Sequence, residues 1–368
     1  MLSKFTGPGI FRFFLALAVF ATHTSRLEFG GAAVHIFFCL SGYWIYTMYI
    51  ERYAKTRRPY LTFVVSRMWR LLPVFWLINL LVLLFLYLNG SSASEWYRAN
   101  PAHFVLSNLL ILGYDNQPIG PLGQAWSLDI EVQFYLIAPF IAIFLARRKV
   151  PGALVLLAVG ALSLTAFVRN CPIRVAAYLI YFMIGMTAAS VHWQPSRRVA
   201  LTSLVGTVLL IACWVATPWR GVIIVGVHPG PLAIYSAHAN EVIGLLMAPF
   251  AIYTTGQKGF VADGMFADLS YIVYLLQTIG VLWVVSHPGG VLTEVAYKTA
   301  AWILVIGFSV VIWKFFDRPI NRLRSLWVNS RKYAAVLQAE TPGSESGGAA
   351  VSDSTACPSS FDVQADRP

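Results

Sequence analysis

Long apolar segments alternate along the chain with short polar ones. Because a helix needs about 20 apolar residues to cross the hydrocarbon of a bilayer, each long segment predicts a membrane span. The apolar stretches 104–113 and 221–227 are shorter, and we expect them to be interfacial or re-entrant. The pattern therefore predicts about ten spans, at residues 8–24, 32–50, 68–88, 129–146, 150–168, 174–191, 199–217, 238–255, 266–286 and 296–316.

Composition supports this pattern. Of the 368 residues, 58% are hydrophobic and 12% are charged, and the mean hydropathy is +0.66. An average soluble protein is roughly 45–50% apolar and about 25% charged. We therefore predict an all-α integral membrane protein, a polytopic helical bundle. The net charge of +11 would suggest nucleic acid in a soluble protein, but in a membrane protein it marks cytoplasmic loops beside anionic lipid, so we expect no nucleic-acid partner.

The positive charges also predict the orientation. With the N-terminus inside, about three quarters of the Lys and Arg residues fall on the cytoplasmic side of the predicted spans. Both termini are then cytoplasmic. Residues 1–330 form the membrane-embedded domain, and 331–368, rich in Gly, Ser and Ala, form a disordered cytoplasmic tail. The four cysteines lie far apart and outside any Cys/His cluster, so we predict no disulfide framework and no metal site.

Two ionisable residues occupy the first predicted span. Arg12 and His23 are eleven residues apart, about 1100° of helical rotation, so they share a face and lie about 16 Å apart along the axis. An ionisable side chain that faces lipid costs free energy, so we expect this face of the helix to point to the protein interior or to a wet cavity. Arginine suits an anionic ligand such as phosphate, and histidine suits a general base. Alternatively, Arg12 reaches the headgroups and His23 bonds to a neighbouring helix.

Further polar residues lie in the next apolar segments. Arg67 and Arg70 share a helical face, and they either clamp a phosphate or follow the positive-inside rule. Gly42 predicts a close helix approach, and Ser41 beside it is either a packing residue or a nucleophilic hydroxyl. Glu131 lies just inside a span, where a carboxylate is a functional hypothesis, and we predict that it orients His23 across a cavity.

In this order the motifs resemble those of the membrane-bound acyltransferase-3 family, over about residues 7–324. The departures are the stretch Gly-Ile-Phe-Arg-Phe at 9–13, where the family has Asp-Gly-Leu-Arg-Gly, Val132, where the family has a second Glu, and Gln277, where His is common. The matching stretches are Arg-x10-His at Arg12 and His23, Phe-Phe-x-Leu-Ser-Gly-Tyr at 37–43, Arg-x-x-Arg at Arg67 and Arg70, Trp-Ser-Leu-x-x-Glu-x-Gln-Phe-Tyr at 126–135, and Leu-Ser-Tyr-x-x-Tyr-Leu at 269–275.

The resemblance implies an O-acyltransferase of the bacterial inner membrane. Its acyl donor would be acetyl-CoA entering from the cytoplasm, and its acceptor a hydroxyl of a cell-surface polysaccharide or glycolipid. Transfer would be direct or by a covalent relay on a protein side chain. The implied roles are His23 and Glu131 in catalysis, Arg12, Arg67 and Arg70 in binding the donor, and Ser41, Trp126 and Tyr135 in contact with substrate.

Each of these roles has a plainer alternative. Trp126 and Tyr135 are also typical of the aromatic belt at the membrane surface. A transporter or flippase of a lipid-linked sugar would also place Arg, His and Glu inside a helical bundle. The two activities differ in their products, since an acyltransferase consumes acetyl-CoA and leaves an ester, whereas a transporter leaves its cargo unmodified.

Overall fold

The protein is a bundle of α-helices with short 3-10 segments, as shown by a computed structural model that describes residues 7–90, 101–114, 120–165, 173–225, 230–287 and 289–340. The α-helices are α1 (Pro8–Thr24), α2 (Gly30–Glu51), α3 (Pro59–Leu88), α5 (Pro101–Leu110), α6 (Trp126–Ala161), α8 (Leu179–Ser190), α9 (Arg197–Ala216), α10 (Ser236–Thr255), α11 (Asp263–Ser286), α12 (Val291–Ile312) and α13 (Arg318–Glu340). A 3-10 segment, η6 (Arg174–Tyr178), leads into α8, and a π-helical turn, η9 (Trp313–Asp317), joins α12 to α13.

Within the described residues, six helical segments are long and apolar enough to cross a membrane. This finding confirms the predicted all-α membrane class. The segments are Gly30–Lys55, Pro59–Leu88, Gly123–Arg148, Arg197–Ala216, Asp263–Ser286 and Val291–Lys332.

Helices also form at the other predicted spans, but they are shorter or more polar. Helix α1 has 17 residues and α8 has 12, which is less than the roughly 20 needed for a full crossing. The first turns of α10 hold His238, Asn240 and Glu241. Because α1 packs against α2, α10 and α11, neighbouring protein covers much of its surface. The count of ten spans and the cytoplasmic location of both termini stay predictions.

Helix α6 reverses direction along its length. The side chain of Gln133 accepts a hydrogen bond from the backbone N–H of Val175 at 3.2 Å, and Ser163 Oγ accepts one from the N–H of Ile180 at 3.3 Å. Residues 133 and 163 would be about 45 Å apart in a straight helix, yet their partners are five residues apart. The chain therefore doubles back between the two spans that the sequence predicted here, and Pro151 lies in the returning part.

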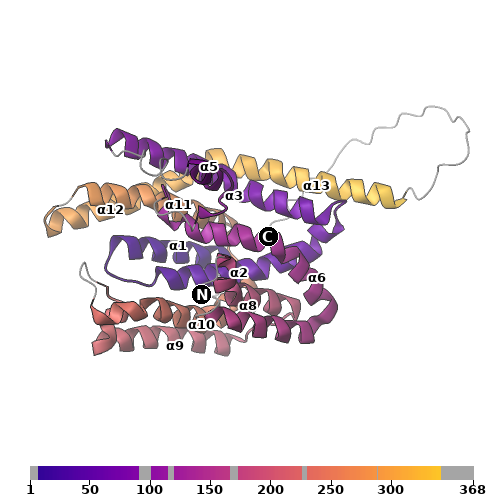
Figure 1. The fold of residues 1–368 in the computed structure, drawn as a ribbon, viewed down its shortest axis with the longest axis horizontal. Coiled ribbons are helices and arrows are strands. Elements are labelled where there is room, and N and C mark those ends of the chain that lie inside the picture. Colours follow the sequence, from indigo (N-terminus) through magenta and orange to yellow (C-terminus); the bar gives the residue numbers. More distant parts are fainter. Residues whose placement is uncertain are drawn as a thin grey trace, which may run out of the picture.

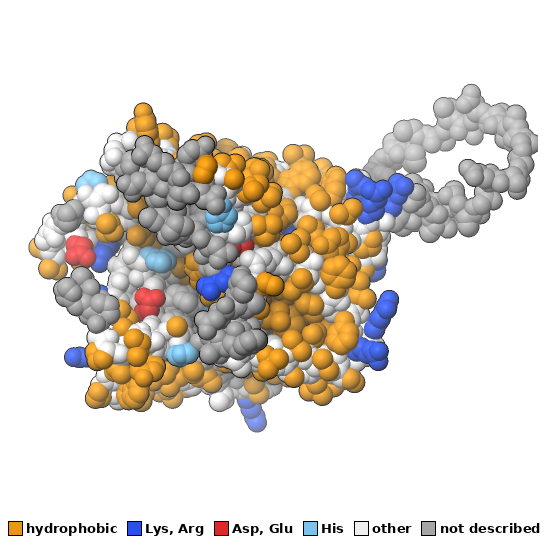
Figure 2. All heavy atoms as spheres, viewed as in Figure 1, with side chains coloured by type: hydrophobic (Ala, Val, Ile, Leu, Met, Phe, Trp, Pro, Cys, Tyr) orange, Lys and Arg blue, Asp and Glu red, His pale blue; other side chains and the backbone are white. Residues whose placement is uncertain are grey.

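The long helices run roughly parallel, with α1 and α2 in the middle of the bundle (Figure 1). Helix α2 packs against α1, α6, α8 and α10. The visible face is mostly hydrophobic, several Lys and Arg residues gather toward the end where α13 lies, and most visible His, Asp and Glu lie toward the other end (Figure 2). An apolar surface with charge asymmetry between its ends fits a helical bundle that is embedded in a bilayer.

Two glycines allow α2 and α8 to touch through their backbones. A Cβ added at Gly42 would overlap the carbonyl oxygen of Phe182, and one added at Gly185 would overlap that of Cys39. Small residues permit such close contact between helices in a membrane. The predicted close approach at Gly42 is thus confirmed, and it holds α2, which carries Ser41, against the rest of the bundle.

We expect Gly185→Ala to destabilise the protein by about 1–3 kcal/mol, because the new methyl group meets backbone that cannot rotate away. The measurement is the thermal unfolding midpoint in detergent, which should fall. Gly206→Ala in α9 is the control, because open space surrounds that position and alanine favours a helix. A variant at Gly185 as stable as the one at Gly206 would contradict this account of the contact.

Helix α13 extends further than the predicted domain boundary. Its printed range ends at Glu340, so residues 331–340, which we predicted to begin the disordered tail, are helical. The rest of that predicted tail, 341–368, lies outside the described residues, as do residues 166–168 of a predicted span.

Candidate functional site

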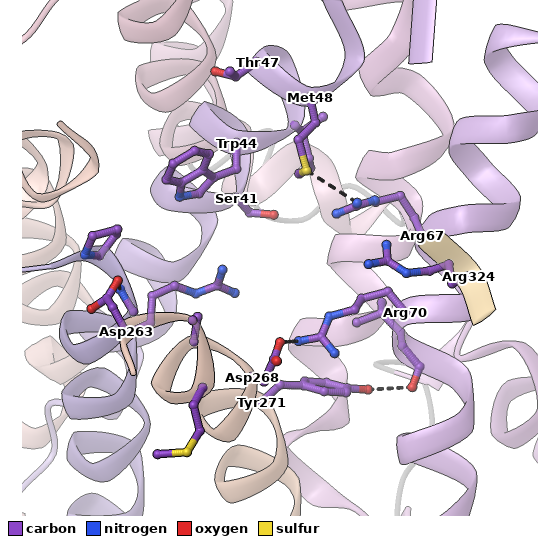
Figure 3. A pocket seen from close by; sticks show the side chains of 18 of the residues that line it. Ser41, Trp44, Thr47, Met48, Arg67, Arg70, Asp263, Asp268, Tyr271 and Arg324 are labelled. Atoms are coloured by element: carbon purple, nitrogen blue, oxygen red, sulfur yellow. Dashed lines mark hydrogen bonds and ion pairs between the residues drawn. The ribbon is translucent and has the colours of Figure 1, made fainter. Parts of the chain in front are cut away.

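A cavity of about 730 Å³ lies between α1, α2, α3, α6 and α11, with residues of α13 at one side. We call it the arginine cavity, because Arg12, Arg67, Arg70, Arg318 and Arg324 line it. Figure 3 shows Arg67, Arg70 and Arg324 extending from one wall toward the wall that carries Ser41 and Trp44. Of the residues that the sequence predicted for the site, this cavity brings together Arg12, Ser41, Arg67, Arg70, Glu131 and Tyr135.

Arg12 is held in place through the start of its helix. The carboxylate of Asp263 accepts hydrogen bonds from the backbone N–H groups of Gly9 and Ile10, at 2.9 and 3.0 Å. A carboxylate at a helix N-terminus satisfies free N–H groups and complements the helix dipole. The Arg12 guanidinium lies 5.9 Å from the Phe37 ring and donates no hydrogen bond to a described residue. Its donors are therefore available for an anion.

A carboxylate and two hydroxyl groups form the polar cluster of this cavity. Ser41 Oγ and the hydroxyl of Tyr135 each donate a hydrogen bond of 2.7 Å to Oε1 of Glu131. Tyr135 follows Glu131 by one helical turn on α6, and Ser41 reaches across from α2. A carboxylate that accepts from a serine hydroxyl can also take its proton, so the cluster is suited to activating Ser41.

Arg67 and Arg324 make contacts with neutral groups. Arg67 donates to the hydroxyl of Tyr53 at 3.2 Å and approaches the sulfur of Met48 at 3.6 Å, and Arg324 donates to Ser66 Oγ at 3.3 Å. The Nε of each has no partner among the described residues. Two guanidinium groups with no carboxylate bonded to them leave a net positive charge on this wall, which favours binding of a phosphate.

Arg70 differs from its neighbours. It donates to Asp317 at 3.0 and 3.1 Å and to Asp268 at 2.7 Å, and it lies 5.9 Å from the ring of Tyr271. Figure 3 shows its ion pair with Asp268. Two carboxylates therefore neutralise its charge, and they tie α3 to α11 and to the η9 turn.

His23 and Trp126 lie away from this cavity. His23 is exposed in the last turn of α1, and it is not among the described residues that line the arginine cavity. The carboxylate of Glu131 bonds to Ser41 and Tyr135, so the structure does not form the predicted contact between Glu131 and His23. Trp126 lines a second cavity.

Arg12 and His23 nevertheless share one face of α1, as their spacing predicted. Ala16 and Val19 lie between them on that face, and both are buried. The face therefore runs as an apolar strip from the arginine cavity to the histidine.

Sequence reasoning missed several residues of the arginine cavity. Arg324 belongs to a run of basic residues after the last predicted span, and such a run by itself indicates only membrane topology. Asp268 and Asp317 were not assigned a role, although both are carboxylates beside apolar segments. The signal that pointed to Glu131, an acidic residue at the edge of a span, applies equally to them.

The chain is similar in sequence to several O-acetyltransferases. The peptidoglycan O-acetyltransferase OatA of Listeria monocytogenes is 26% identical over 319 residues, covering 82% of this chain and 47% of that protein. The O-acetyltransferase OatA of Staphylococcus aureus (strain NCTC 8325 / PS 47) is 26% identical over 335 residues, covering 84% of this chain and 50% of its own length. A putative peptidoglycan O-acetyltransferase of Bacillus subtilis, YrhL, is 24% identical, with 82% and 47% covered.

The chain thus spans about half the length of the curated relatives it matches. No solved structure gives a significant match. The family model described as an acyltransferase domain matches residues 6–316, which include every residue proposed for the site except Arg318 and Arg324. The chain therefore belongs to the acyltransferase family that this domain defines.

Proposed function

We propose that the protein transfers an acetyl group from cytoplasmic acetyl-CoA to a hydroxyl of a cell-wall or cell-surface glycan, as a multi-pass protein of the bacterial inner membrane. The observation that carries the proposal is the arginine cavity, in which guanidinium groups that bond to no carboxylate among the described residues lie beside the cluster of Ser41, Glu131 and Tyr135. The names of the relatives support an O-acetyl product and a glycan acceptor.

The donor fits the cavity by charge. Arg67 and Arg324 bind phosphate groups of CoA at the mouth, where charge-assisted hydrogen bonds are strong. Arg12 binds further in, and direct transfer with His23 as base requires the pantetheine arm to pass Ala16 and Val19, which are buried in the bundle, over about 16 Å. Arg70, whose charge Asp268 and Asp317 neutralise, holds the wall of the cavity in place instead of binding the donor.

The acceptor reacts with help from His23. The imidazole takes the proton of the acceptor hydroxyl as its oxygen attacks the thioester carbonyl. The carbon–sulfur bond then breaks, the sulfur of CoA takes that proton from the imidazolium, and an ester remains on the acceptor.

A relay gives the same products in two steps. Ser41 loses its proton to Glu131 and attacks the thioester, which leaves acetyl-Ser41 and the thiol of CoA. The sulfur of CoA takes the proton from Glu131, and the Glu131 carboxylate then takes the proton of the acceptor hydroxyl, whose oxygen attacks that ester and releases Ser41. Acetyl label that stays on the protein after denaturation and is lost from Ser41→Ala would identify this route.

The defining experiment supplies labelled acetyl-CoA to membranes that contain the protein, with native cell-wall glycan as acceptor. Label in the glycan fraction that alkali removes is the expected result, because esters are base-labile. Modified glycan would exclude the transporter alternative as the sole activity. Unlabelled glycan after complete incubation would contradict the proposal.

For the donor site, we expect Arg324→Gln to raise the KM for acetyl-CoA about tenfold or more, because a hydrogen bond between charged groups contributes roughly 1.5–3 kcal/mol. Arg322→Gln is the matched control, since Arg322 is exposed on the same helix and does not line the cavity. The measurement is initial rate against acetyl-CoA concentration. Equal KM values for the two variants would remove Arg324 from the donor site.

A further inference from the structure

The second cavity, of about 390 Å³, shares α2 and α6 with the arginine cavity and lies nearer the N-terminal end of each of these two helices. We call it the aromatic cavity, because the rings of Trp126 and Tyr178 line it, 5.5 Å apart between centroids. Glu28, His35 and Ser236 also line it. Ligand pockets commonly enclose about 300–1,000 Å³, so this one has room for a sugar unit.

The wall of this cavity is a fixed structure. The N–H of Glu28 donates to the carbonyl of Ile223 at 2.7 Å, and the side chain of Asn240 donates to the carbonyl of Glu28 at 2.9 Å. Asn240 also accepts from the N–H of Ala32 at 2.8 Å, at the start of α2. These bonds join α10, α2 and the preceding loop, so the cavity is preorganised.

Several polar groups in this cavity have no partner among the described residues. The carboxylate of Glu28 and the indole N–H of Trp126 make no hydrogen bond with one of them, and Ser236 Oγ is buried without a partner. Burial raises the pKa of the Glu28 carboxyl, which places it in poorly hydrated surroundings where hydrogen bonds are stronger. Unsatisfied donors and acceptors beside ring faces match a ligand that carries both hydroxyl groups and apolar faces.

The aromatic cavity also lies at the level of His23. A Cβ added at Gly30 would lie 3.1 Å from the side chain of Thr22, so the end of α1 packs beside the start of α2. Gly31, the next residue, lines the aromatic cavity. His23 follows Thr22, so the predicted base is within one turn of this cavity along the bundle.

The two cavities are close to each other through the protein. Trp126 precedes Glu131 by five residues on α6, and His35 precedes Ser41 by six on α2, which are rises of about 7.5 and 9 Å. Phe38, which lies between His35 and Ser41 on α2, is buried. The aromatic cavity is therefore about one and a half helical turns from Glu131 and Ser41 along these helices.

We propose that the aromatic cavity is the acceptor site, and that it binds a saccharide with a pyranose ring against Trp126 and Tyr178 and a hydroxyl on Glu28. This inference rests on the proposed function, because it assigns the place of the acceptor in that reaction. It places donor and acceptor at opposite ends of one path through the bundle, with His23 on the acceptor side.

The test measures binding and turnover separately. Protein in nanodiscs is titrated with soluble glycan strands prepared from peptidoglycan, and the Kd is compared between wild type, Glu28→Gln and Trp126→Ala. We expect Kd to rise about tenfold or more in each variant, because each loses contacts that a saccharide would make. The KM for acetyl-CoA should stay at the wild-type value, because the donor binds in the other cavity.

The controls separate this effect from misfolding. Glu294→Gln removes a carboxylate of α12 that pairs with Lys298 and does not line the cavity, so its Kd should match wild type. Trp126→Phe keeps an aromatic ring and should bind more tightly than Trp126→Ala. Thermal unfolding midpoints close to wild type show that the variants fold.

The outcomes distinguish the two proposals. Absence of glycan binding by the wild type, or unchanged Kd in Glu28→Gln and Trp126→Ala, would overturn the acceptor site even if acetyl-CoA is consumed. Glycan binding that these variants weaken, without ester formation by the wild type, would support the site and contradict the proposed function.

Discussion

His23→Ala is expected to lower acetyl transfer to glycan by about 10²–10⁴-fold, which is the range that a general base contributes. The acceptor hydroxyl keeps its proton at neutral pH, and without a base its attack on the thioester is slow. The KM for acetyl-CoA should change little, because His23 lies outside the arginine cavity. The measurement is initial transfer rate in membranes with matched amounts of protein.

The matched control for this prediction is His287→Ala. His287 is exposed at the end of α11, where its ring nitrogen contacts the carbonyl of Trp283 at 2.9 Å, and it lines neither cavity. Transfer by that variant should be close to wild type. Equal transfer by His23→Ala and wild type would exclude His23 as the base, and the search would then turn to Glu131.

The sequence predicted which residues line the arginine cavity better than it predicted which residues they bond to. Arg12, Ser41 and Glu131 were each identifiable because a polar residue in an apolar span is costly unless it faces the protein interior. Whether such residues meet depends on how helices distant in sequence align along the bundle. The expectation that these residues meet in one site came from the motif order shared with the family, and not from helical periodicity.

Contacts between distant helices account for what the sequence could not show. The pairing of Arg70 with Asp268 and Asp317 joins α3 to segments 198 and 247 residues later. No local pattern distinguishes Arg70 from Arg67 three residues earlier. Span length was also uncertain, because α1 is enclosed by other helices and does not need to match the bilayer alone.

The position of Trp126 illustrates the same limit in the aromatic cavity. The resemblance implied a substrate contact for Trp126 and a catalytic role for Glu131, five residues later in the same motif. Five residues of helix instead separate them by about 7.5 Å, so they line different cavities. Direction along the helix axis, as well as the face of the helix, decides which cavity a residue reaches.

Glu131→Gln is expected to reduce acetyl transfer by about 10²–10⁴-fold, because the amide cannot take a proton from Ser41 as the carboxylate can. The side chain keeps its size, and its carbonyl oxygen still accepts hydrogen bonds from Ser41 and Tyr135, so the fold should persist. The measurement is transfer rate, with a thermal unfolding midpoint for each variant. Glu51→Gln, which removes an exposed carboxylate from the same cavity, should stay close to wild type.

The same variant separates the relay from direct transfer. If Ser41 carries the acetyl group, Ser41→Ala should lose as much activity as Glu131→Gln, and the double variant should be little worse than either, because the two residues act in one step. If transfer is direct, Ser41→Ala should retain most activity. Full activity in Glu131→Gln would contradict the relay and leave direct transfer with His23 as base, since it would show that the carboxylate bonded to Ser41 and Tyr135 has no part in the chemistry.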